Sequence, residues 1–315
     1  MPFFLCVRIK SKQINFNSVS NIIISGSTNP TLARQLARQT KSPLAPTEIT
    51  KFPDNETYVN IKQDLHSQNV FIVQSCSNPA NESLMELLIL IDAAKRLQPK
   101  KITAIIPFYP YRRQEKKVKS GESVTAELVA RLLKAAGANK VIAVELHTEK
   151  VEAFFDFPLV HIRTLPLLIE HFGKKIDQAR DFIVVAPDHG SADESSTLAS
   201  ALGIPLAVID KTRISFNTVE IEKLTGEVAG KNVIIIDDEI STGGTLCKVT
   251  AALKKHNVKD IYVGVTHGVF ADQAIAKINR APIKEVVITD TIPQTKKYKK
   301  IKVLSVVGLI SKEIK

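Results

Sequence analysis

Short apolar runs alternate with amphipathic stretches along most of this chain. Several runs are unbroken valine and isoleucine, which is typical of strands covered on both faces of a sheet. Between them apolar residues recur at helical spacing, as at Leu84, Leu87, Leu88 and Ile91. The alternation predicts βα units around a mostly parallel sheet. We expect strands at Asn21–Ser25, Val70–Gln74, Ile102–Pro107, Val141–Leu146, Phe182–Pro187, Leu206–Asp210, Val233–Asp237, Ile261–Thr266 and Val286–Thr289.

Two stretches share one strand–loop–helix–strand plan, which indicates an internal repeat. The first runs from Asn69-Val-Phe-Ile-Val-Gln-Ser to Lys101-Ile-Thr-Ala-Ile-Ile. The second runs from Asn232-Val-Ile-Ile-Ile-Asp-Asp to Asp260-Ile-Tyr-Val-Gly-Val. Their loops differ, because only the second is rich in glycine and hydroxyl groups. We therefore expect duplicated domains, of which only the second kept a phosphate loop.

The amino-acid composition limits the classes of protein to which this chain can belong. The chain has 315 residues, 44% of them apolar and 24% charged, which suits two ordinary globular domains. No run approaches the roughly 18 apolar residues of a membrane span, so we expect no membrane partner. The apolar start, Met1–Val7, lacks the basic region and cleavage site of a signal peptide. The three cysteines are far apart, which favours a reducing cytoplasm over disulfides or a zinc site.

The formal net charge of +11 raises the question of a nucleic-acid partner. The basic residues are spread along the chain, aromatic residues make up 6%, and there is no tryptophan. Clusters of stacking aromatics, which single-strand binders use, are therefore missing, and we expect no nucleic acid. The densest basic run, Lys296–Lys302, is typical of a solvated face. Phosphorylated small ligands also require a positive field.

The strongest local motif runs from Val233 to Thr245, where a buried strand leads into two carboxylates and then a glycine-containing loop that opens a helix. The expected loop consists of Ser241, Thr242, Gly243, Gly244 and Thr245. Glycines allow close backbone approach, and a helix start offers free N–H groups, so the loop suits a phosphate monoester. Asp237 and Asp238 could accept hydrogen bonds from ribose hydroxyls or hold Mg²⁺. A simple helix cap is the bland alternative, but adjacent carboxylates beside a buried strand are costly without a partner.

This stretch resembles the ribose-phosphate-binding motif of the type I phosphoribosyltransferase fold. Four further segments, taken in order, resemble the ribose-phosphate diphosphokinases, also called phosphoribosyl pyrophosphate synthetases. They are Phe52-Pro-Asp-Asn-Glu56, Asn81–Asp92, Pro107-Phe-Tyr-Pro-Tyr-Arg-Arg-Gln114 and Pro187-Asp-His-Gly190. The resemblance covers roughly residues 20 to 312, and the segments together are far more specific than any one alone.

The resemblance implies two tandem α/β domains of phosphoribosyltransferase type, each with a mostly parallel central sheet flanked by helices. We expect the first domain at 20–164 and the second at 165–295, with the tail 296–315 packing on the first. ATP is then expected between the domains, and ribose 5-phosphate on the second.

For ATP, the resemblance implies that Phe52, Asp54 and Glu56 form an adenine pocket that reaches the ATP of a neighbouring subunit. The resemblance therefore also implies that the protein is a homo-oligomer. Arg113 and Gln114 would hold the same ATP, and arginine suits phosphate because its guanidinium binds two oxygens at once. Taken alone, Phe52 is more often a core or interface aromatic, and the lysines that follow Gln114 are more often a solvated loop.

For the reaction, the resemblance makes His147 and Asp188 direct or water-mediated holders of the magnesium ion (Mg²⁺) on ATP. Lys211 and Arg213 would lie on a loop that closes over the phosphates. The 1-hydroxyl of ribose 5-phosphate attacks the β-phosphorus of ATP, and AMP leaves, so positive charge around the transferring oxygens is what the protein supplies. Alone, a His at a strand end is more often a loop residue with a backbone partner, and a surface Lys-x-Arg after a strand is normally a solubility feature.

Two alternatives remain open at this stage. A phosphoribosyltransferase would use the same phosphate loop, but would not need the segments at Phe52–Glu56 and Arg113–Gln114. A non-catalytic regulatory homologue is favoured by Asp193 and Glu194, which stand where many relatives carry a basic residue that holds ATP. The retained reaction residues favour an enzyme instead.

Overall fold

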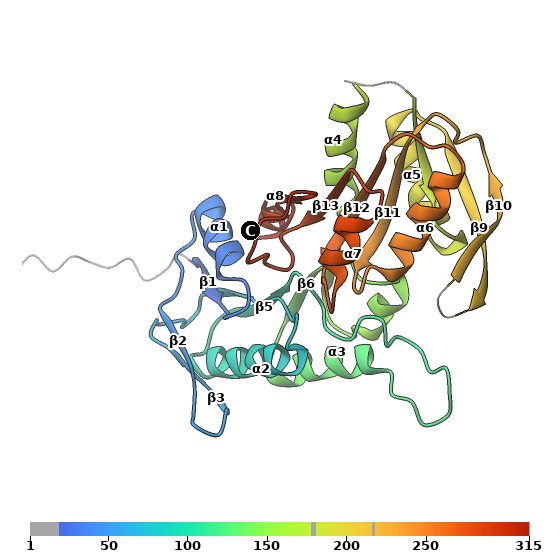
Figure 1. The fold of residues 1–315 in the computed structure, drawn as a ribbon. Helices are drawn as coiled ribbons and strands as arrows, with labels where there is room; N and C mark the ends of the chain where they lie inside the picture. The colour runs from blue at the N-terminus through green and yellow to red at the C-terminus, as the bar shows by residue number, and fades with distance from the viewer. Residues whose placement is uncertain (1–18, 178–180, 216–217, 315) are drawn as a thin grey trace, which may run out of the picture.

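The fold comprises two lobes, each built on one sheet (Figure 1). The structure, a computed structural model, describes residues 19–177, 181–215 and 218–314, with the side chains of 210–223 outside the description. The first sheet is parallel, in the order β1-β4-β5-β6-β7. Its strands are β1 (Asn21–Ser25), β4 (Asn69–Val73), β5 (Lys101–Ile106), β6 (Lys140–Val144) and β7 (Leu159–Ile162).

Helices cover both faces of the first sheet. α1 (Pro30–Thr40) packs on one face, against Ile23 and Phe71. α2 (Ala80–Arg96) and α3 (Thr125–Ala136) lie side by side on the other (Figure 1). The strands therefore need apolar residues on both faces, which is why they appear in the sequence as unbroken apolar runs.

A two-stranded hairpin projects from this lobe (Figure 1). Its strands, β2 (Thr47–Lys51) and β3 (Thr57–Ile61), pair antiparallel and are mostly exposed or half-buried. The sequence pattern did not predict them, because strands with so little buried surface carry little apolar signal.

The second sheet has the order β10-β9-β8-β11-β12-β13-β14 and is parallel except for β10. Its strands are β8 (Phe182–Ala186), β9 (Leu206–Ser215), β10 (Thr218–Thr225), β11 (Asn232–Ile240), β12 (Ile261–Gly268), β13 (Glu285–Thr289) and β14 (Ile301–Leu304). One face packs against α6 (Gly244–Lys255) and α7 (Ala274–Arg280), and the other against α4 (Leu165–Ile176) and α5 (Ala192–Leu202). Short 3₁₀ turns stand at Glu149–Phe154, His189–Ser191 and Ser311–Glu313.

The nine strands expected from the apolar runs are all present, so that prediction is confirmed. Three of them are longer than expected, since β9 continues to Ser215, β11 to Ile240 and β12 to Gly268. Asp237 and Asp238 therefore lie within β11, not after it. Five strands were missed, namely β2, β3, β7, β10 and β14.

The two lobes repeat one plan. β1, β4, β5, β6 and β7 correspond in order to β8, β11, β12, β13 and β14. The registers also agree when Lys101 is aligned with Asp260, because Ala104 then corresponds to Val263. Their partners, Val141 and Val286, are each the second residue of their strand. The β2–β3 hairpin of one lobe corresponds to β9–β10 of the other. The expected α/β fold of two mostly parallel sheets flanked by helices is confirmed.

The C-terminal residues divide between the lobes, although the whole tail was expected on the first domain. β14 pairs with β13 in the second sheet. Only the helix α8 (Val307–Ile310) and its neighbours reach the first lobe, where Ile310 and Ile314 join Leu32 and Leu36 in one apolar core. The exchange is reciprocal, because α4 follows the first sheet in sequence but covers the second.

Candidate active site

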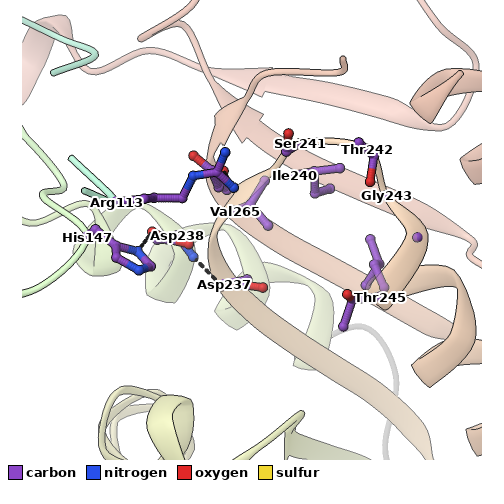
Figure 2. Close-up of a pocket in the computed structure, with 13 residues that line it drawn as sticks. Arg113, His147, Asp237, Asp238, Ile240, Ser241, Thr242, Gly243, Thr245 and Val265 are labelled. Atoms are coloured by element: carbon purple, nitrogen blue, oxygen red, sulfur yellow. Dashed lines mark hydrogen bonds and ion pairs between the residues drawn. The ribbon is translucent and has the colours of Figure 1, made fainter. Parts of the chain in front are cut away.

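A cavity of about 420 Å³ opens where β11 leads into α6 (Figure 2). The residues of the second lobe that line it are Asp237, Asp238, Glu239, Ile240, Ser241, Thr242, Gly243, Gly244, Thr245, Leu246 and Val265. Arg113 and His147 enter from the first lobe. The cavity is therefore built at the carboxyl ends of strands, where ligands bind in sheets of this type.

The loop before α6 has the geometry of an anion site. Gly243 has φ +70°, a left-handed conformation that glycine adopts without strain, and it places the start of α6 at Gly244. Among the described residues, no side chain caps this helix. Its first N–H groups and the positive end of its dipole are thus available to a negatively charged group in the cavity.

Asp237 and Asp238 have opposite electrostatic surroundings. Partial desolvation and the adjacent charge of Asp238 raise the pKa of Asp237 to about 7. Burial alone would raise the pKa of Asp238 as well, but hydrogen bonds from His147 and Arg112 and their charges hold it well below its ordinary value. The surroundings of Asp238 therefore favour its charged form, whereas those of Asp237 favour its protonated form.

A contact between the lobes brings His147 to Asp238. His147 follows β6 in the first lobe, and its Nδ1 lies 2.6 Å from Oδ2 of Asp238 (Figure 2). The hydrogen bond to Asp238 raises the pKa of His147, although partial burial opposes the shift. The sequence analysis selected both residues but did not predict that they touch.

Arg112 and Glu239 are site residues that the sequence analysis missed. Arg112 is 2% exposed, and its guanidinium donates to Asp238 Oδ2 at 2.7 Å and to the Glu239 carboxylate. Arg112 donates to Oε2 of Glu239, and Nη1 of Arg113 lies 3.0 Å from Oε1 of the same carboxylate. The available sequence signal was the charge complementarity between the Arg-Arg pair and the run Asp-Asp-Glu, but nothing local indicated that the two segments meet.

Arg113 lines the cavity, and 60% of its side chain is exposed. Gln114 lines a second cavity of about 270 Å³ that shares Arg113 and Glu239 with the first. Its Oε1 accepts a hydrogen bond from Thr125 at 2.6 Å. The loop after β5 therefore contributes to two adjoining cavities.

Carboxylates at neighbouring strand ends fit a magnesium ion. Asp188 follows β8, which pairs with β11, and its charge contributes to the raised pKa of Asp237. The Asp188 side chain accepts a hydrogen bond from the Ser191 N–H at 3.1 Å. Mg²⁺ prefers oxygen ligands and usually keeps waters and substrate phosphates, so these carboxylates suit it. No cluster of three His, Cys, Asp or Glu side chains forms a complete protein metal site within the described residues.

The segment Phe52–Glu56 lies away from this cavity, at the tip of the β2–β3 hairpin (Figure 1). The turn is closed by the Phe52 N–H, which donates to the Glu56 carbonyl at 2.9 Å, and by Asp54, which accepts from the Glu56 N–H at 3.2 Å. Phe52 is 51% exposed and packs edge-on against Tyr58. Within one chain these residues do not join the residues around Asp238.

Lys211 and Arg213 lie in β9, opposite Ile221 and Val219 of β10. They were expected on a loop, and the structure places their backbone in a strand of the sheet-edge hairpin instead. Their side chains lie outside the described part of the chain.

Comparison with known proteins places this geometry in a family. Residues 21–137 match the N-terminal domain of ribose phosphate pyrophosphokinase, and residues 219–315 match the phosphoribosyl synthetase-associated domain. The ribose-phosphate pyrophosphokinase of Fusobacterium nucleatum is 43% identical over 303 residues, which are 96% of this chain and 95% of that protein. That of Bacillus subtilis is 40% identical over 295 residues, 93% and 92% of the two chains. The chain belongs to the ribose-phosphate pyrophosphokinase family.

A solved structure agrees with this assignment. The phosphoribosylpyrophosphate synthetase of Mycobacterium smegmatis is 37% identical and superposes with a TM-score of 0.88, over 94% of this chain and 97% of that one. The family named from the sequence segments and the expectation of a ribose-phosphate pyrophosphokinase enzyme are both confirmed. Within the described residues, no helix of this family member is long and apolar enough to cross a membrane.

Glu194, which the sequence analysis singled out, is half-buried in α5. Burial and the nearby charge of Glu145 raise its pKa to about 7, although Arg163 opposes the shift. At neutral pH it therefore carries only part of a negative charge, which reduces its repulsion of an anionic ligand.

Proposed function

We propose that this chain transfers pyrophosphate from Mg-ATP to the 1-hydroxyl of ribose 5-phosphate, giving phosphoribosyl pyrophosphate and AMP. The observation that carries the proposal is the joining of an uncapped helix start, two carboxylates and two basic residues of the other lobe around one cavity. Such a cavity offers separate partners for a phosphate, for sugar hydroxyls and for a second anionic substrate.

Ribose 5-phosphate binds to the second lobe in this proposal. The N–H groups and hydroxyls of Ser241, Thr242, Gly243, Gly244 and Thr245 surround the 5-phosphate. Asp237 and Asp238 accept hydrogen bonds from ribose hydroxyls. The left-handed φ of Gly243 supports this arrangement, because a left-handed residue in a turn allows successive N–H groups to form an anion-binding concavity.

ATP binds on the side of the first lobe. Arg113 and Gln114 hold it, and Phe52, Asp54 and Glu56 of a neighbouring subunit complete its adenine pocket. Two features support a shared site: the hairpin tip lies away from the cavity of its own chain (Figure 1), and Phe52 exposes half of an aromatic side chain. Exposed aromatics of this kind are enriched at interfaces. The protein is then a homo-oligomer.

Mg²⁺ accompanies ATP, with Asp188 and His147 as its direct or water-mediated holders and Asp237 close by. When bound, the ion neutralises charge on the phosphate oxygens. Asp188 follows the strand next to Asp237, which supports a shared cation. Nδ1 of His147 is already engaged by Asp238, so any contact of His147 with the hydrated ion uses Nε2.

The chain positions the reactants and offsets charge in the transition state. Lys211 and Arg213 are the catalytic cations, which bind the oxygens of the transferring group. β9 pairs with β8 only through Leu206–Val208, so Lys211 and Arg213 lie where the hairpin extends beyond β8, and we propose that this part closes over the cavity. Such closure would also exclude water, which otherwise competes with the ribose hydroxyl.

Two smaller assignments accompany this function. The first domain comprises 20–164 and the second begins at 165, which is supported by the packing of α4 on the second sheet. A cytoplasmic location suits Cys76 and Cys247, both free thiols.

The test is release of AMP from ATP, Mg²⁺ and ribose 5-phosphate, comparing the wild-type protein with Lys211→Ala. We expect AMP and phosphoribosyl pyrophosphate in equal amounts, and turnover lowered about 10²-fold or more in the variant, as for loss of a transition-state charge donor. Omission of ribose 5-phosphate is the control and should abolish AMP release. ATP binding without AMP release would favour the regulatory homologue instead.

A further inference from the structure

Arg112 is far more buried than Arg113, the other arginine that lines the site. Its side chain is 2% exposed and its guanidinium carbon lies 5.4 Å from the centre of the Phe108 ring. One terminal nitrogen binds Asp238 and the other binds Glu239. A side chain fixed at both nitrogens and over an aromatic face can impose an orientation on its partners.

The partner whose orientation matters is Asp238. Arg112 and His147 both bind its Oδ2, at 2.7 and 2.6 Å. Because they approach the same oxygen from the first lobe, the carboxylate cannot rotate without losing one of two charge-assisted hydrogen bonds. Its other oxygen, Oδ1, is bound by neither of them and keeps a fixed direction.

A purely structural tie between the lobes is a weaker explanation of Arg112. Burying an arginine and carboxylates costs desolvation energy, and apolar residues of similar size usually stabilise a fold as well or better. The Arg112 Nε also has no hydrogen-bond partner among the described residues, which adds to the cost. A functional demand on Asp238 explains why such a cluster stands here.

We propose that Arg112 is a positioning residue for ribose 5-phosphate, which acts by holding the Asp238 carboxylate in the one orientation that accepts the sugar hydroxyls. This rests on the proposed function, in which Asp238 binds the ribose. Arg112 also lines the second cavity, but its effect on ribose 5-phosphate passes through Asp238 in this proposal.

A double-mutant cycle tests this dependence, using Arg112→Met, Asp238→Asn and the double variant. The measured quantity is the KM for ribose 5-phosphate at saturating Mg-ATP, followed by AMP release. We expect Arg112→Met to raise this KM tenfold or more in the wild-type background and less than twofold in the Asp238→Asn background, because coupled residues are not additive. Arg112→Lys, which can still reach one carboxylate, should give an intermediate KM.

The control is Arg96→Met, which removes an arginine with 76% exposure that pairs with Asp92 on α2 and should leave the KM unchanged. Equal effects of Arg112→Met in both backgrounds, or no effect in either, would overturn the proposal. Should Arg112→Met fail to fold in the wild-type background, Arg112→Lys replaces it in both backgrounds, and the KM increase is again expected only where Asp238 is intact. If turnover is too slow, the Kd of ribose 5-phosphate with Mg²⁺ and a non-hydrolysable ATP analogue replaces the KM. Absence of AMP release by wild type would instead refute the proposed function.

Discussion

Glu145 and Asp290 occupy equivalent positions in the two lobes, at the carboxyl ends of β6 and β13. The Glu145 carboxylate accepts a hydrogen bond from the Thr164 N–H at 2.9 Å, and the Asp290 carboxylate accepts one from the Val306 N–H at 2.8 Å. Thr164 and Val306 directly precede α4 and α8, the helices that the lobes exchange. In each lobe, the same carboxylate–backbone contact therefore lies just before the helix that packs on the other lobe.

The repeat brings equivalent strand ends together twice, with different results. In one contact, His147 after β6 meets Asp238 of β11 beside an open cavity. In the other, Thr291 after β13 meets Ser75 after β4, whose hydroxyl donates to the Thr291 carbonyl at 2.6 Å in a buried setting. Only the first pair places ionisable side chains next to a cavity. Of the two equivalent contacts, only this one therefore forms part of the candidate active site.

Alanine substitutions at Gly243 and Gly244 distinguish the effect of backbone strain from the effect of a side chain that blocks a ligand. Gly243 has φ +70°, and an added Cβ would lie 3.8 Å from Ala274, so Gly243→Ala should cost about 1–2 kcal/mol through the backbone alone. Gly244 has no positive φ and has room for a Cβ, so Gly244→Ala should leave the unfolding free energy unchanged. If the loop approaches a phosphate, Gly244→Ala still raises the KM for ribose 5-phosphate severalfold. Urea unfolding and AMP release measure the two effects, and an unchanged KM would contradict the phosphate assignment.

The shared ATP site predicts complementation between two inactive variants. Phe52→Ala damages the site of a neighbour, whereas Asp238→Asn damages the variant's own site. Mixing and reassembling the two should restore about a quarter of the sites, because both intact halves meet in about that fraction of random pairs. Activity of the mixture is compared with that of each variant alone. A mixture no more active than its components would show that each chain completes its own site.

Glu285 should contribute stability that depends on pH. Burial alone would raise its pKa, but hydrogen bonds from His171 and Lys175 outweigh burial and lower it to about 2 from 4.5. A lowered folded pKa gives stability that is present above about pH 4.5 and is lost as the pH falls towards 2. Glu285→Gln should therefore cost about 1–2 kcal/mol at pH 7, after allowance for solvent screening.

Chemical unfolding of wild type and Glu285→Gln at several pH values checks this, and the difference should shrink below pH 4.5. Glu127→Gln is the control, since Glu127 forms only an exposed pair with Arg131 and should change stability by less than about 0.5 kcal/mol. A difference that stays constant down to pH 3 would contradict the assignment of the effect to the Glu285 charge.

The exchanged helix α8 should matter for the whole fold although it is short. Ile310 is fully buried against the first lobe, so Ile310→Ala should destabilise the protein by about 2–5 kcal/mol. Val303→Ala, in the adjoining strand and 46% exposed, is the matched control with an expected effect below about 0.5 kcal/mol. Thermal or denaturant unfolding measures both. Equal small effects would show that the C-terminal helix is not part of the cooperative core.

The sequence by itself determined the strands whose two faces are both buried, and the loop from Ser241 to Thr245, because apolar runs and turn chemistry are local properties. It did not predict the β2–β3 hairpin, whose exposed strands leave little apolar pattern. It also missed the helix exchange, since the apolar faces of α4 and α8 indicate burial without naming the sheet that buries them.

Only the tertiary structure decided how the chemistry is assembled. Arg112 and Asp238 are 126 residues apart in sequence, and His147 and Asp238 are 91 apart, yet all three meet where the lobes touch. A charged side chain carries no local pattern that identifies so distant a partner. Burial of the Arg112 guanidinium and orientation of the Asp238 carboxylate follow from the packing of one lobe on the other, which no single segment encodes.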